Sequence, residues 1–60
     1  MLSFEQAEAQ LTPAQRKALA QAVLDNQPLP QDLTEAQRTF CMGLEVYREY
    51  ECEADVMKYL

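Results

Sequence analysis

The chain has 60 residues, and its ten Asp and Glu against five Lys and Arg give a net charge of −5. This acidic balance argues against direct binding of nucleic acid, which depends on Lys and Arg at the phosphates, and against binding to anionic membranes. The apolar runs are too short to span a bilayer, and the N-terminus lacks the pattern of a secretory signal, so we expect a cytoplasmic protein.

The same helix-start motif occurs three times, at residues 2–6, 11–15 and 33–37. In each copy a Leu precedes a Ser or Thr, and a Gln follows the hydroxyl residue three positions later. The hydroxyl oxygen can accept a hydrogen bond from the third following backbone N–H, while the Gln side chain accepts from the N–H of the capping residue. The sequence therefore predicts an all-α fold with one helix after each motif.

The first two predicted helices are short and lie close together in the sequence. The first covers residues 4–10 and the second residues 13–26. Pro13 is favoured at the first position of a helix and disfavours helical geometry at Thr12, so we expect a break between them. The apolar face of the second helix is narrow and consists mainly of small side chains: Ala14, Ala18, Leu19, Ala22 and Val23.

A linker containing two prolines, residues 28–32, should join the second helix to the third. Pro28 and Pro30 favour an extended path, which allows the chain to turn back into a helical hairpin. Leu29 lies between them and is expected to cover the open end of the hairpin. With no second linker in the sequence, residues 1–60 form one helical domain.

The third predicted helix is the longest, from residue 35 to residue 59, and carries an apolar seam. Steps of four and three residues connect the seam positions, with Leu44 beside them: Ala36, Phe40, Gly43, Tyr47, Tyr50, Ala54 and Met57. A helix of this length spans about 36 Å, roughly twice the second helix, so part of the seam should lack a partner within the chain.

Two further expectations concern the faces of this helix. Gly43 interrupts the seam and should permit close approach of a second-helix residue, Ala18 or Ala22. Three apolar residues fall on the opposite and mostly polar face: Met42, Val56 and Leu60. The C-terminus is apolar on several sides through Val56, Met57, Tyr59 and Leu60, which either join an intermolecular contact or provide local cover or fray.

The uncovered seam predicts contact with another protein, either a second copy of the chain or a larger partner. Aromatic and Met side chains contribute much of the binding energy in such contacts. The expected anchors are Phe40, Leu44, Tyr47, Tyr50, Met57 and Leu60.

Acidic residues crowd the C-terminal half of the same helix: Glu45, Glu49, Glu51, Glu53 and Asp55. Like charges four residues apart repel one another, and this end of a helix prefers cations, so helix stability does not account for them. Two interpretations remain open. The residues form either a solvated face that maintains solubility or a surface that meets a basic patch on a partner.

No catalytic constellation is visible in the sequence. Histidine is absent, which removes Ser-His and Cys-His pairs, and one glycine is too few for a phosphate-binding loop. Cys41 and Cys52 would lie about 16 Å apart along one helix, too far for a disulfide within the chain. We expect reduced thiols, with a bridge between two copies as the alternative, and no enzymatic activity, metal or cofactor.

These observations predict a non-enzymatic protein–protein interaction module, such as an adaptor, an assembly chaperone or a regulatory inhibitor. A domain of this size hides only about 60% of its unfolded surface, so we expect oligomerisation or docking on a partner to complete its core. The alternative is an acidic mimic that masks the basic surface of a nucleic-acid-binding protein. A DNA-reading helix-turn-helix is disfavoured, because the connector is long and the charge has the wrong sign.

Overall fold

The computed structural model describes residues 1–60 and contains four helices and no strand. The helices are α1 (Phe4–Gln10), α2 (Pro13–Leu24), α3 (Glu35–Glu49) and α4 (Glu53–Met57). The all-α fold predicted from the sequence is therefore confirmed. None of the four helices combines the length and the hydropathy that a bilayer crossing requires.

The first three helices begin at the three predicted capping motifs. The hydroxyl oxygens of Ser3, Thr12 and Thr34 accept from the backbone N–H three residues later, at 3.1, 3.1 and 3.2 Å. The Gln side chain of each motif accepts in return from the N–H of the capping residue, at 2.9 Å in every case. Each pair satisfies two N–H groups that a helix start leaves without partners.

The corner between α1 and α2 is held by Arg16. Its Nη1 atom donates to the carbonyl oxygens of Glu8 and Leu11, at 2.8 and 2.7 Å. Both carbonyls lie where α1 ends, and that of Glu8 also accepts from the backbone N–H of Leu11 at 3.2 Å. As predicted, the chain breaks at Thr12 and Pro13 opens the next helix.

α2 ends at Leu24, two residues before the predicted end, in a left-handed turn. Asn26 has φ 56°, its N–H donates to the carbonyl of Val23 at 3.1 Å, and the N–H of Gln27 donates to that of Ala22 at 3.0 Å. This pair of bonds is the Schellman motif, and Asn is one of the few residues that adopt its left-handed position readily.

The helix predicted for residues 35–59 is two helices in the structure. Glu51 has φ 62° and stops α3, with its N–H donating to the carbonyl of Arg48 at 3.1 Å. The N–H of Cys52 donates to the carbonyl of Tyr47 at 2.7 Å. The motif is the one that ends α2, but it places Glu where Gly or Asn is usual.

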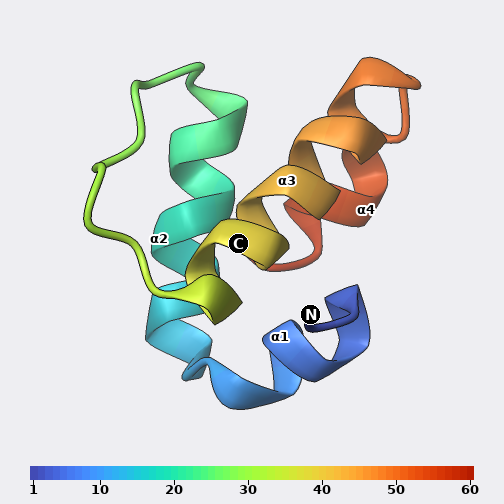
Figure 1. The fold of residues 1–60 in the computed structure, drawn as a ribbon. Coiled ribbons are helices and arrows are strands. Elements are labelled where there is room, and N and C mark those ends of the chain that lie inside the picture. Colours follow the sequence, from blue (N-terminus) through green and yellow to red (C-terminus); the bar gives the residue numbers. More distant parts are fainter.

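α3 lies at the centre of the fold and contacts the other three helices (Figure 1). Residues 50–52, the α3–α4 turn, reverse the chain so that α4 folds back beside α3 and also contacts α2. Leu29 of the linker is half-buried and packs against the core. The buried core residues come from all four helices and the α1–α2 corner: Ala7, Leu11, Leu19, Ala20, Val23, Ala36, Phe40, Cys41, Leu44 and Val56.

Gly43 faces α1 instead of the predicted neighbours Ala18 and Ala22. A Cβ atom at position 43 would lie 2.6 Å from Cε2 of Phe4, so the glycine makes room for that ring. The expectation was wrong because it assigned the seam to α2, whereas α1 packs across this part of α3.

Candidate interaction surface

The apolar seam of α3 is covered within the chain. Phe40 and Leu44 are both fully buried. The Phe40 ring stacks on Phe4, with centroids 5.3 Å apart, and meets the Tyr59 ring edge-on at 5.0 Å. Tyr47 is half-buried and packs against Phe4, with centroids 5.6 Å apart. α1 and residues 53–60, which we call the C-terminal segment, therefore supply the cover that we expected from another protein.

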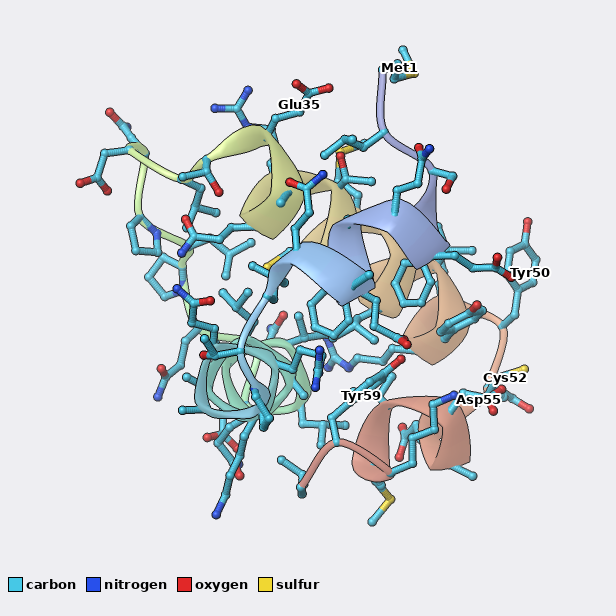
Figure 2. All side chains as sticks on the ribbon, turned by 90° about the horizontal axis from the view of Figure 1, so that it is seen from below. Met1, Glu35, Tyr50, Cys52, Asp55 and Tyr59 are labelled. Atoms are coloured by element: carbon cyan, nitrogen blue, oxygen red, sulfur yellow. The ribbon has the colours of Figure 1, made fainter.

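The C-terminal segment closes over the seam through Val56 and Tyr59. Val56 is fully buried, which corrects its predicted place on the polar face of one long helix. The Tyr59 hydroxyl donates to the Glu8 carboxylate and so joins α1 to the end of the chain. Burial, the hydrogen bond to Glu8 and the charge of Glu8 raise the pKa of Tyr59 above its ordinary value. In Figure 2 this side chain points into the fold, whereas Tyr50 points away from it.

The six predicted anchors therefore divide into two groups. Phe40, Leu44 and Tyr47 pack inside the chain. The other three remain exposed: Tyr50 is 75% exposed, Met57 56% and Leu60 46%. The structure separates the two groups because the α3–α4 turn changes the direction of the chain, so that Val56 takes the inward position that a straight helix would give to Met57.

A different apolar strip lies on the outer face of α3. Met42, Val46 and Tyr50 are exposed and follow one another at intervals of four residues, so they form a continuous row; we call these three residues the α3 ridge. The sequence pattern placed Met42 on the polar face, where it is exposed, but did not connect it with Val46 and Tyr50, because Tyr50 had been assigned to the seam. The regular spacing of the three residues was a signal that could have revealed the ridge.

A shallow groove of about 270 Å³ continues the α3 ridge towards the N-terminus. It lies between the residues that precede α1 and the helix α3, and its apolar part comes from Met1, Leu2 and Met42. Glu35 and Arg38 line its polar edge. Exposed apolar residues that are continuous with a groove suit the docking of another protein segment.

The predicted acidic residues are distributed around the α3–α4 turn. Three of them line one polar hollow of about 460 Å³, together with Asn26 and Arg48: Glu45, Glu49 and Glu53. Within this hollow, Arg48 Nη1 donates to Asn26 Oδ1 at 3.2 Å and connects the ends of α2 and α3. Glu51 lies in the turn and Asp55 on α4, both exposed.

The two cysteines are unbridged and occupy different environments. Cys41 is buried in the core, and Cys52 is exposed in the α3–α4 turn. Burial, with a smaller effect of the Glu45 charge, raises the pKa of the Cys41 thiol from 9.0 to about 11. The core thiol is therefore protonated, and hence unreactive, at neutral pH.

No family model, no characterised protein and no solved structure matches this chain.

Proposed function

We propose that this chain is a non-enzymatic, cytoplasmic protein-interaction module that binds a larger protein through the α3 ridge. The observation that carries the proposal is the exposure of Met42, Val46 and Tyr50 in one row on the central helix. A 60-residue chain has few large apolar residues, and placing three of them together in solvent costs core area that a small fold needs. Adaptor, assembly chaperone and regulatory inhibitor are the roles open to such a module.

The charge around the α3 ridge specifies the chemistry of the partner. Glu45 and Glu49 lie on α3 beside the ridge, and the whole chain carries a net charge of −5. A partner segment with an apolar stripe and flanking Lys or Arg side chains would match both features. The α3 ridge and the adjoining groove together form an elongated surface that suits an amphipathic helix of this composition.

The test uses a synthetic amphipathic helix of about 16 residues made of Leu and Lys, labelled for fluorescence anisotropy. We expect Met42→Ser and Val46→Ser each to weaken its binding about tenfold, because the apolar contact is lost. Met57→Ser is the matched control, since this exposed Met lies on α4 and outside the ridge. Equal losses in Met42→Ser and Met57→Ser would reject the ridge as the binding surface.

A second candidate function is the masking of a basic nucleic-acid-binding surface by the acidic hollow. It is favoured by the convergence of Glu45, Glu49 and Glu53 from two helices on one hollow. The discriminating probe is a Lys-rich peptide with no apolar residue, measured at rising salt concentrations. Masking predicts that this peptide binds as well as the Leu/Lys helix and dissociates steeply with salt. It also predicts loss of binding after Glu49→Gln and Glu53→Gln, whereas an apolar contact at the ridge predicts weak binding throughout.

A further inference from the structure

The α3–α4 turn holds a conformation that its sequence disfavours. Glu51 is left-handed, a conformation whose cost for a residue with a side chain is roughly a five- to thirty-fold factor in an equilibrium constant. Tyr50, Glu51 and Cys52 include neither Gly nor Pro. All three could instead continue a helix with an ordinary backbone.

The end of α2 provides an internal contrast. Its left-handed residue is Asn26, which tolerates that conformation, and Pro28 follows two residues later. A helix cannot continue through this segment without losing hydrogen bonds and meeting the proline ring. The chain must therefore turn after α2, whereas after α3 it turns only because the C-terminal segment packs on the core.

The contacts that close the C-terminal segment are not restricted to one copy of the chain. Val56 fills the core, Tyr59 packs on Phe40, and the Tyr59 hydroxyl reaches Glu8. A C-terminal segment from a second copy could make the same three contacts, provided that its own α3–α4 turn were straight.

We propose that two copies of this chain form a dimer by exchanging α4. In this dimer the α3–α4 turn of each copy straightens and α3 and α4 become one helix. Val56 of each copy then fills the core of the other copy, and Tyr59 packs on the other copy's Phe40. The exchange keeps the buried contacts and relieves the left-handed conformation of Glu51 in both copies. The entropy of association opposes it. Strained short hinges favour such exchange. The inference does not depend on binding at the α3 ridge: Met42 and Val46 lie outside the exchanged contacts, and only Tyr50 belongs both to the ridge and to the turn.

The test compares the wild-type chain with variants at position 51 by size exclusion with light scattering, up to about 1 mM protein. Glu51→Gly accepts the left-handed turn and should weaken the dimer by roughly 30-fold, because the change acts in both copies. Glu51→Ile is β-branched, which makes the left-handed turn still less favourable, and should shift the chain towards dimer. Asn26→Gly and Asn26→Ile are the matched controls, and neither should promote dimerisation.

The exchange itself is detected by nuclear Overhauser contacts in a mixture of isotope-labelled and unlabelled copies. Phe40 and Tyr59 have ring centroids 5.0 Å apart, so an exchanged dimer gives contacts between a labelled Phe40 and an unlabelled Tyr59. A dimer with this contact only within one copy would refute the exchange. The exchange would also be refuted if the wild-type chain were monomeric and the Glu51→Ile chain formed no dimer at the highest concentration. This holds whether the Glu51→Ile chain is folded or unfolded.

Discussion

The start and the end of α3 are determined in different ways. At the start, Thr34 and Gln37 form a complete capping box through bonds of 3.2 and 2.9 Å. At the end, Glu51 is left-handed although nothing in residues 50–52 favours that conformation. The start therefore depends on neighbours in the sequence, and the end depends on the burial of Val56 and Tyr59 beyond it.

The end of α2 shows that the difference is not one between helix starts and helix ends in general. It uses the same Schellman bonds as α3, but with Asn26 at the left-handed position and Pro28 after it. Local signals are sufficient there. The α3–α4 turn is the boundary at which tertiary packing overrides local preference.

The largest effect is expected from removing the ring on which the C-terminal segment closes. Phe40→Ala should lower the free energy of unfolding by about 3–5 kcal/mol, because it deletes a fully buried ring and its contacts with Phe4 and Tyr59. Urea titration followed by circular dichroism measures this. Tyr50→Ala, at the exposed residue that caps the end of the same helix, should change the value by less than about 0.5 kcal/mol. Similar losses in both variants would contradict the assignment of the core.

Val56→Ala should cause a smaller loss in the free energy of unfolding. It should also destabilise the end of α3 more than its start. The lost burial and the remaining cavity amount to about 2 kcal/mol. Hydrogen exchange should show faster exchange at the amides of α4 and Cys52, with the first turn of α3 less affected. Met57→Ala, beside it and exposed, is the control. Uniform acceleration along the chain would mean that α4 does not open separately.

The start of α3 is tested by Thr34→Ala, which removes the oxygen that accepts from Gln37 N–H. We expect a loss of about 1 kcal/mol in the free energy of unfolding. Thr34→Ser keeps the hydroxyl and should restore most of it. A larger loss from Thr34→Ala than from Val56→Ala would reverse the order of importance of local capping and tertiary burial.

Replacing Glu51 by Gly should stabilise the closed monomer by about 0.5–1 kcal/mol, since the gain from relieving the left-handed backbone exceeds the entropy cost of Gly. Asn26→Gly, at the equivalent position after α2, should change the stability by only a few tenths of a kcal/mol, since Asn already tolerates the turn. Thermal unfolding at low protein concentration compares the two. An equal gain at both sites would show that Glu51 carries no special strain.

The smallest expected effect on the free energy of unfolding at neutral pH comes from Cys41 and Tyr59, the two groups whose pKa is raised. Folding raises the pKa of Cys41 from 9.0 to about 11 and also raises the pKa of Tyr59 above 10.0. The folded state then binds more protons than the unfolded state above pH 9, so stability is complete below that pH and declines as the pH rises. Tyr59→Phe should reduce the decline above pH 10. A stability that is constant from pH 7 to pH 11 would contradict both shifts.

The sequence was sufficient for the parts of the fold that depend on short-range contacts. The three capping boxes and Pro13 predicted the starts of α1, α2 and α3 correctly. The turn at Glu51 could not be predicted, because the residues that enforce it pack against Phe40 and Glu8, far away in the sequence. The placement of Val56 and Met57 was wrong for the same reason, since it assumed a straight helix.

The candidate surface was predicted only in part. Of the predicted anchors, only Tyr50 belongs to the α3 ridge. Met57 and Leu60 are exposed elsewhere, and Phe40 and Leu44 are core residues. The seam pattern correctly marked apolar residues on one face of the helix. It did not specify whether the same chain or another protein covers them, because both kinds of burial select the same residue types.

The contrast between the two thiols makes the turn directly observable. Cys41 is buried and its pKa is about 11, whereas Cys52 is exposed at the point where the chain reverses. A maleimide fluorophore should therefore attach to Cys52 alone at neutral pH. The natural chain thus carries a selective labelling position at its hinge, and the emission of the dye can report on straightening of the backbone in real time.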